Sequence, residues 1–240
     1  MSFSSRLKAF ARRHLADSRL IDPYYISHST LSAAIRRAGQ HINADRLLDI
    51  GCGEKPYRRF FTARQYVGVD LPTYGPQAVD LFGSALRLPF CDASFDALLC
   101  TEVLEHVPEP DALLKETARL LKPGGALILT TPQTWGLHLE PYDYFRYTRY
   151  GLEALAQRAG LIVESIQPTC GVWATLGQRA VDAIYSRYGA NKPLLIRGIV
   201  MFFCAIWLTI ALAQDRIGGH RGDTLDNVLV ARKPNKVTSN

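Results

Sequence analysis

Two glycines and an acid stand where an α/β sheet would hold a ligand. The segment GCGEKPY (51–57) directly follows the apolar run RLLDI (46–50), and Asp70 ends the next apolar run, QYVGVD (65–70). A glycine turn after a buried strand lets the backbone approach a ligand closely. A carboxylate at the carboxyl end of a strand can accept two hydrogen bonds from a ribose diol. These residues predict a site for a ligand that carries a ribose.

The spacing of the glycines argues against the common nucleotide cofactors. The dinucleotide fingerprint needs a third glycine three residues after the second, and that position is Pro56. A P-loop is excluded because no Gly-Lys-Ser or Gly-Lys-Thr follows the turn. The ligand is therefore expected to be neither NAD, nor FAD, nor a triphosphate held by a P-loop.

The elements that would position these residues alternate along the chain. Brief apolar runs, typical of buried parallel strands, occur at 46–50, 65–70, 95–101, 126–132 and 161–168, with a last strand predicted at 224–234. Helical spacing of apolar residues predicts helices at 110–125 and 152–160. Strands that alternate with helices indicate a doubly wound α/β sheet.

The order of motifs resembles the class I S-adenosylmethionine-dependent methyltransferases, in particular the group that includes quinone-biosynthesis methyltransferases. The resemblance runs through GCGEKPY, Asp70, GSALRLPF (83–90), FDALLCTEVLEHVPEPD (95–111) and LLKPGGALILTTP (120–132). It implies a Rossmann-like sheet whose last strand is antiparallel, and S-adenosylmethionine as cofactor with S-adenosylhomocysteine as product. GCGEKPYR and PYDYFRYTRYGL (141–152) look like a sub-branch associated with cell-envelope glycan and lipid metabolism.

The resemblance assigns a set of residues to the cofactor. They are Asp49, Gly51, Cys52, Gly53, Asp70, Leu71, Ser84, Ala85 and Thr101. Asp70 matches the ribose-binding acid of the family. Two positions depart from the pattern: Ser84 stands where many relatives have an aspartate facing the adenine amine, and Lys55 replaces the third glycine of Gly-x-Gly-x-Gly.

The chemistry that this cofactor supports needs few catalytic groups. A methyl group leaves a sulfonium by in-line displacement, so alignment supplies much of the acceleration, and a base matters only where the acceptor must first lose a proton. The candidate catalytic residues are His106, His138, Asp143 and Arg146. Two structural interpretations stay open. His106 could merely fix the turn before Pro108, and residues 138–148 could form a lid in which an aspartate and an arginine pair internally.

A metal centre is not expected from the sequence. Glu102, Glu105 and His106 are similar to a motif of metal-dependent RNA end methyltransferases, but those pair the first histidine with another, and Val107 stands here. The five cysteines include no C-x-x-C pair, which favours reduced thiols in a cytosolic protein.

The net charge of +6 is concentrated near the start of the chain. Residues 1–40 hold seven Lys and Arg against two Asp, a local charge of +5. Residues 2–16 combine this charge with an apolar helical face (Phe3 to Leu15), which is typical of an interfacial helix that contacts anionic lipid, although a solvated terminal helix fits as well. Charges interrupt every candidate secretory signal in this stretch.

An apolar run of sixteen residues, GIVMFFCAIWLTIALA (198–213), raises the question of a membrane span. Such a run is about 24 Å long as a helix, short of a hydrocarbon core of about 30 Å. It also lies between two strands of one sheet, so a single crossing would separate them. We expect a helical hairpin (172–189 and 192–216) that contacts one leaflet, with burial in a homodimer or against the sheet as alternatives.

These patterns predict an N-terminal basic helical extension (1–40) and a methyltransferase domain (41–240) that includes the apolar insertion (171–218). The expected function is methyl transfer to a small-molecule or lipid- or glycan-linked acceptor at the cytoplasmic membrane face. The alternatives are an RNA methyltransferase and a cofactor-binding scaffold without turnover. Nucleic acid is the less favoured partner, because no Asn/Asp-Pro-Pro-Tyr motif follows the strand predicted at 95–101.

Overall fold

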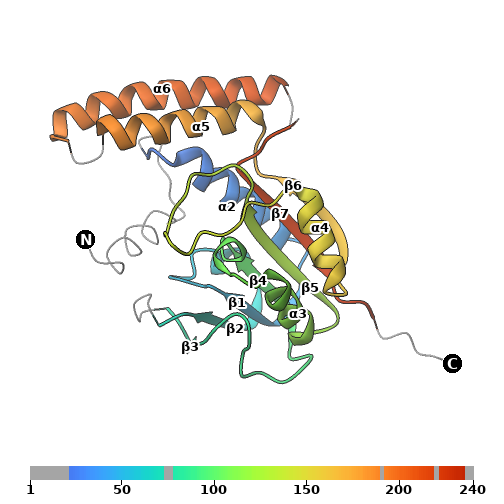
Figure 1. Cartoon of the computed structure of the whole chain (residues 1–240). Coiled ribbons are helices and arrows are strands. Elements are labelled where there is room, and N and C mark those ends of the chain that lie inside the picture. Colours follow the sequence, from blue (N-terminus) through green and yellow to red (C-terminus); the bar gives the residue numbers. More distant parts are fainter. Residues whose placement is uncertain (1–21, 73–77, 190–191, 219–221, 236–240) are drawn as a thin grey trace.

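The computed structural model describes residues 22–72, 78–189, 192–218 and 222–235 (Figure 1). The predicted interfacial helix at 2–16 and most of the predicted extension 1–40 lie outside these residues. Within them, helix α2 (Tyr25–Gly39) precedes the sheet and lies in the predicted helical extension, although the sequence analysis gave it no bounds of its own.

One sheet of seven strands forms the centre of the molecule, in the order β3-β2-β1-β4-β5-β7-β6. The strands are β1 (Ala44–Ile50), β2 (Ala63–Asp70), β3 (Leu81–Phe82), β4 (Phe95–Thr101), β5 (Leu121–Pro132), β6 (Ile162–Pro168) and β7 (Asp226–Arg232). Strands β1 to β5 pair in parallel, and β7 lies antiparallel between β5 and β6. This arrangement confirms the predicted doubly wound sheet with an antiparallel last strand.

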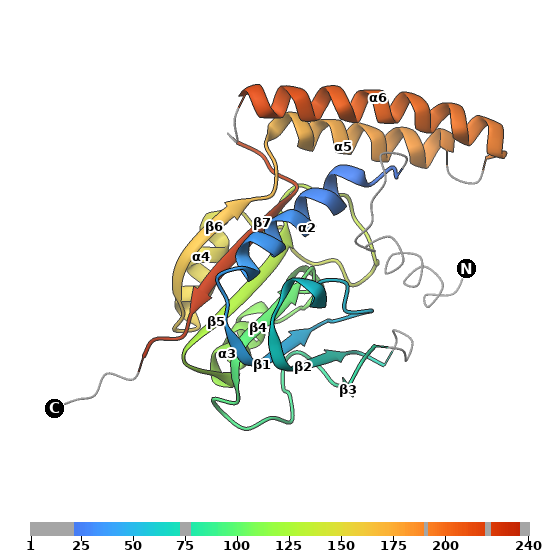
Figure 2. The same ribbon diagram turned by 180° about the vertical axis from the view of Figure 1, so that it is seen from behind.

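Helices cover both faces of the sheet (Figures 1 and 2). On one face lie α3 (Pro110–Leu120) and α4 (Arg149–Arg158), and on the other lies α2. Neighbouring residues of one strand serve opposite faces: Leu98 packs in the cluster of α3 and α4, and Leu99 packs in the cluster of α2. Two-sided burial explains why the strands are continuous apolar runs rather than alternating ones.

The boundary between α3 and β5 differs from the prediction. The helix was expected to continue to the Pro-Gly-Gly stop at 123–125, but it ends at Leu120, and Leu121 is already extended (φ −67°, ψ 137°). Leu121 pairs with Phe95 of β4, so the Pro-Gly-Gly segment belongs to a long β5. Pairing with the neighbouring strand therefore overrides the helical pattern of the sequence.

The apolar insertion forms the predicted helical hairpin. Helix α5 (Val172–Ile184) continues through a π-helical turn, η3 (Tyr185–Gly189), and α6 (Leu194–Gly218) returns beside it (Figure 1). The two helices approach closely where Gly177 faces Ala211, because a Cβ on Gly177 would lie 2.5 Å from the alanine methyl. Asp215 of α6 accepts a 2.8 Å hydrogen bond from the Gly171 amide at the start of α5, which ties the two ends together.

Helix α6 is longer than the apolar run that the sequence analysis considered. Its 25 residues extend about 37 Å. Among the described residues it is the one helix that is long and apolar enough to cross a membrane, judged by length and composition alone. The length argument against a span was therefore wrong, whereas the topological argument stands, because α6 leads into β7, which lies inside the sheet between β5 and β6.

Candidate active site

The glycine turn after β1 is fixed to the end of β2. The amides of Gly51 and Cys52 both donate to the carbonyl oxygen of Val69, at 2.8 and 3.1 Å. Gly51 and Gly53 have φ values of +70° and +48°, in the left-handed region that glycine adopts at little cost. A Cβ on Gly53 would meet no atom within 4 Å, so this turn leaves open space on its outer side.

Asp70 lies at the end of β2 beside this turn. Its Oδ2 accepts a 2.8 Å hydrogen bond from the amide of Gly53, and its Oδ1 accepts one of 2.7 Å from the amide of Leu71. Burial raises the pKa of Asp70, and these two amides act in the opposite direction. Each oxygen keeps a lone pair, so the carboxylate can accept two further hydrogen bonds from a diol.

Lys55, which replaces the third family glycine, has the backbone conformation that a glycine would favour. Its φ is +53°, and its amide donates a 2.7 Å hydrogen bond to the carbonyl oxygen of Cys52. A non-glycine residue in this region costs roughly 1–2 kcal/mol. The ammonium group pairs with Asp80, which also accepts from the amide of Gly68. Through Asp80, the Lys55 side chain is thus connected to β2, a contact that a glycine at this position could not make.

The glycine turn and Asp70 line a cavity of about 260 Å³ at the carboxyl ends of β1, β2 and β4. Eight of the nine residues that the family resemblance assigns to the cofactor form its wall: Gly51, Cys52, Gly53, Asp70, Leu71, Ser84, Ala85 and Thr101. The ninth, Asp49, is not in this wall. It is 1% exposed and accepts a 2.6 Å hydrogen bond from the hydroxyl of Tyr66.

Asp49 therefore lies under the turn rather than on the ligand side. Its Oδ1 has no hydrogen-bond partner among the described residues, and burial raises its pKa to about 7. The sequence pattern placed it correctly near the end of β1, but the alternation of side chains along a strand directs it away from the cavity.

His106 is the one candidate catalytic residue in the wall of this cavity. It ends a short 3-10 helix, η2 (Leu104–His106), which follows β4. Its Nδ1 lies 2.7 Å from the carbonyl oxygen of Tyr142, so the imidazole joins η2 to the segment that follows β5. Burial lowers the pKa of His106 to about 4, so the imidazole is neutral at pH 7.

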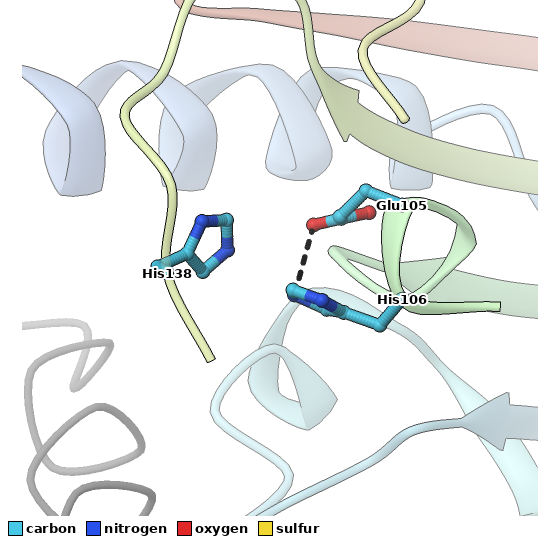
Figure 3. A group of neighbouring side chains, drawn as sticks. All are labelled: Glu105, His106 and His138. Atoms are coloured by element: carbon cyan, nitrogen blue, oxygen red, sulfur yellow. Dashed lines mark ion pairs between the residues drawn. The ribbon is translucent and has the colours of Figure 1, made fainter. Parts of the chain in front are cut away.

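The other three candidates form one cluster beside it. Both guanidinium NH₂ groups of Arg146 donate to Asp143, at 2.6 and 2.7 Å. The same carboxylate accepts a 2.9 Å hydrogen bond from the amide of His138 and lies 3.3 Å from His138 Nδ1. The ring centroids of His138 and His106 are 4.7 Å apart, edge to face (Figure 3). The internal pair predicted for a lid is present, and it also holds a histidine beside the cavity.

A second cavity of about 190 Å³ adjoins this cluster. Its wall contains His138 but also residues that sequence analysis did not assign to a site: Tyr24, Ser27, His28, Trp135, Gly136, Leu137, Asp182 and Asp226. Glu102 lines both cavities. It follows β4 at φ +53° and accepts a 2.8 Å hydrogen bond from the hydroxyl of Thr130.

Three carboxyl groups lie at this junction: Glu105 and Asp226 are buried, and Glu102 is half-buried. Burial is the main cause that raises the pKa of Glu102. Burial likewise raises the pKa of Glu105 to about 8 and the pKa of Asp226 to about 7. Their mutual repulsion acts in the same direction. A signal for Asp226 was available in the sequence: an antiparallel last strand begins at the edge where the parallel strands end, so its first residue belongs to the site.

Comparisons with known proteins agree with this geometry. Residues 48–129 match the family described as "Methyltransferase domain". A ubiquinone biosynthesis O-methyltransferase of Xanthomonas oryzae pv. oryzae is 36% identical over 121 residues, which are 50% of this chain and 46% of the relative. A 27-O-demethylrifamycin SV methyltransferase of Amycolatopsis mediterranei is 34% identical over 102 residues, 35% of this chain and 38% of the relative.

Among solved structures, phosphoethanolamine N-methyltransferase 2 of Haemonchus contortus in complex with S-adenosyl-L-methionine has a similar fold. The TM-score is 0.59 with 20% sequence identity, over 98% of this chain and 60% of that chain. The chain spans about half the length of the curated relatives it matches. The residues that match the family, 48–129, contain the glycine turn, Asp70 and the end of β4.

Proposed function

We propose that this protein transfers a methyl group from S-adenosylmethionine to a small-molecule or lipid- or glycan-linked acceptor, because residues 48–129 match a methyltransferase-domain family. The observation that carries the proposal is the convergence of Gly53, Asp70 and Thr101 on one cavity, from the ends of three neighbouring strands. Open α/β sheets bind their ligands at this edge.

The cavity fits the cofactor in several of its parts. Asp70 has acceptor capacity for the ribose hydroxyls, and the open space beside Gly53 admits the amino-acid portion close to the backbone. Ser84 and Ala85 line the same cavity, and the family resemblance assigns them to the adenine end of the cofactor. When bound, the cofactor supplies an electrophilic methyl group on a sulfonium.

The residues of the chain would act mainly by alignment. His106 is in the wall of the larger cavity and His138 in that of the second, so an acceptor in the second cavity would approach the cofactor past these two rings. Asp143 and Arg146 hold His138 in place. Exclusion of water and a fixed direction of approach contribute most of the acceleration in such a displacement.

The test uses radiolabelled S-adenosylmethionine. Purified protein is incubated with extracts of envelope lipids and glycans and, separately, with RNA, and the label is followed into each fraction. We expect label in a lipid, glycan or small-molecule fraction, and much less label with the Asp70→Ala variant at the same cofactor concentration. Label in RNA would favour the RNA methyltransferase alternative. Calorimetric binding of the cofactor without any transfer would favour the scaffold.

We also propose that the hairpin attaches the protein to the cytoplasmic face of a membrane. The side of α6 that packs on α5 and the domain is buried at Cys204, Leu208 and Ala211, whereas Phe202 and Phe203 are 63% and 65% exposed. Figure 1 places α6 on the outside of the hairpin, away from the sheet. Contiguous exposed apolar surface of this kind is typical of an interaction site.

The distribution of charge favours lipid over a second copy of the chain. No charged residue occurs between Arg197 and Asp215, and Arg197 and Arg216 flank the apolar stretch. Trp207 is 50% exposed within it. Basic ends and an aromatic ring beside an apolar face are the pattern of a helix that lies in the membrane interface. The basic segment at 2–16 would add a second, electrostatic attachment.

Co-sedimentation with vesicles tests the attachment. We expect binding to vesicles that contain anionic lipid, partly weakened by salt, and release when Phe202, Phe203 and Trp207 are all replaced by Ser. The matched control replaces three residues of similar exposure outside the hairpin, Phe82, Tyr150 and Ile162, by Ser. A wild-type dimer that ignores vesicles would overturn the proposal and make the hairpin a protein interface.

A further inference from the structure

Three groups that commonly ligate metals meet between the two cavities. Glu105 and His106 come from η2, and His138 comes from the segment after β5 (Figure 3). One ligand atom from each of the three lies within 4.8 Å of the other two. The two histidines are 32 positions apart in sequence, so only the fold brings His138 close to Glu105 and His106.

Two atoms of this group lack the partners that buried polar atoms normally have. Glu105 Oε1 and His106 Nε2 are buried, and neither has a hydrogen-bond partner among the described residues. They lie 3.7 Å apart, too far for a hydrogen bond to each other. Glu105 is itself completely buried. Buried polar atoms without a partner are rare, and a cation between these two atoms would satisfy both.

The hydrogen bonds of the two rings indicate which nitrogen of each ring can bind a cation. His106 Nδ1 lies 2.7 Å from the carbonyl oxygen of Tyr142, and His138 Nδ1 lies 3.1 Å from that of Gly136. A carbonyl oxygen accepts only, so each Nδ1 carries the proton and each Nε2 carries the lone pair. Metal-binding histidines are usually oriented in this way, by a bond from the other ring nitrogen to a carbonyl or carboxylate.

We propose that Glu105, His106 and His138 form a site for one divalent transition-metal ion of the zinc class. Two imidazole nitrogens and one carboxylate oxygen are the protein ligands of many catalytic zinc sites, which keep a further position open. Ligands at bond lengths near 2.1 Å lie about 3.4 Å apart, so distances within the set shorten by up to about 1.4 Å when the ion binds.

The open position would face the junction of the cavities, because His106 lines the larger cavity and His138 the second. A hydroxyl bound there would lose its proton to water more readily, because the charge of the ion stabilises the oxygen anion that then takes the methyl group. The methyl acceptor is therefore expected to be an oxygen atom, such as a phenol or enol hydroxyl. This last step rests on the proposed function, whereas the metal site does not.

The test is metal binding by untagged protein that has been freed of metal with a chelator. Titration with Co²⁺, followed by visible absorption, and with Zn²⁺, followed by calorimetry, should each give one site per chain. The Co²⁺ spectrum should lack thiolate charge-transfer bands, which separates this site from the exposed Cys91. We expect His138→Ala and His106→Ala to weaken metal affinity at least about 100-fold and His41→Ala, an exposed histidine, to leave it unchanged.

Cofactor affinity, measured on the same variants, separates the two proposals. His138 is outside the wall of the larger cavity, so His138→Ala should bind S-adenosylmethionine as the wild type does. Metal affinity that is absent in the wild type, or equal in wild type and His138→Ala, would overturn the metal site whatever the cofactor result. Metal binding without cofactor binding would instead remove the proposed function and leave the metal site.

Discussion

The amide of Gly53 and the carboxylate of Asp70 are joined by a 2.8 Å hydrogen bond, although 17 residues separate them in the chain. The bond links the turn after β1 to the end of β2, so the wall of the larger cavity is built as one unit. The acid thus both positions the turn and remains able to accept hydrogen bonds from a ligand.

Asp70→Ala is expected to weaken the binding of S-adenosylmethionine by about 10- to 100-fold, because hydrogen bonds to a charged group contribute about 1.5–3 kcal/mol. Calorimetric titration measures the change, and thermal unfolding checks that the fold is retained. The matched control is Asp45→Ala, which removes an exposed aspartate paired with Arg64 outside the cavity. Equal affinity in Asp70→Ala and wild type would remove the cofactor assignment.

Ser84→Asp is expected to strengthen cofactor binding by about 2- to 10-fold. The substitution restores the carboxylate that many family members place opposite the adenine amine, and Ser84 is exposed, so the larger side chain has room. Ser84→Ala serves as the control and should change the affinity little, since the Ser84 hydroxyl only accepts a long 3.3 Å bond from the amide of Leu86. A loss of affinity in Ser84→Asp would show that the adenine ring lies elsewhere.

Asp143→Asn is expected to lower the rate of methyl transfer while cofactor affinity stays within about twofold of wild type. Asp143 holds Arg146 and His138 but is outside the wall of the larger cavity. Removal of a residue that orients a functional histidine typically costs about 10- to 100-fold in activity. Both quantities are measured on the same preparation.

A matched ion pair separates a positioning role from a general loss of stability. Asp111 also receives two hydrogen bonds from one arginine, Arg158, but this pair is exposed and outside both cavities. Asp111→Asn should therefore leave the rate unchanged. If Asp143→Asn lost cofactor binding as fully as methyl transfer, the segment 138–148 would be a structural lid only.

Glu116 is expected to make stability depend on pH in the acid range. Burial opposes its ionisation, but hydrogen bonds from Arg119 and from the amide of Leu88 outweigh burial and hold its pKa below the ordinary value of 4.5. A lowered folded-state pKa means that the stabilisation is complete above pH 4.5 and is lost as the pH falls through the folded-state value.

Denaturant unfolding between pH 7 and pH 3 measures this effect. The free energy of unfolding of the wild type should fall more steeply with acid than that of Glu116→Gln, and the variant should be less stable at pH 7 by about 1.5–3 kcal/mol. Parallel curves for the two proteins would contradict the prediction. Since Glu116 holds the segment after Ser84 against α3, its loss should also loosen the cavity wall.

The sequence was sufficient to predict the parts of the fold and site whose signal lies within a short stretch of chain. The strand ends at Ile50, Asp70 and Thr101 follow from apolar runs closed by polar or glycine residues, and these ends place most of the larger cavity. The short strand β3 was missed because two residues make no periodic pattern. The left-handed backbone at Lys55 was unpredictable from residue type, because its conformation depends on the neighbouring strand.

The second cavity could not be predicted from local patterns. Its wall combines α2, the segment after β5, α5 and the first residue of β7, and no short window of sequence contains these together. The expectation of no metal considered only the residue that follows His106. Local sequence could not show that the fold brings ligand atoms of His138, Glu105 and His106 within 4.8 Å of one another.

The interior position of β7 determines when the sheet can finish folding. All of β5, β6 and the hairpin precede β7 in the chain, yet β7 pairs with both strands. Until residues 226–232 leave the ribosome, β5 and β6 each expose an unpaired edge, and such edges are prone to pair with other chains. Helix α6 is synthesised during this interval, so a nearby lipid surface would be available to its apolar side before the sheet closes.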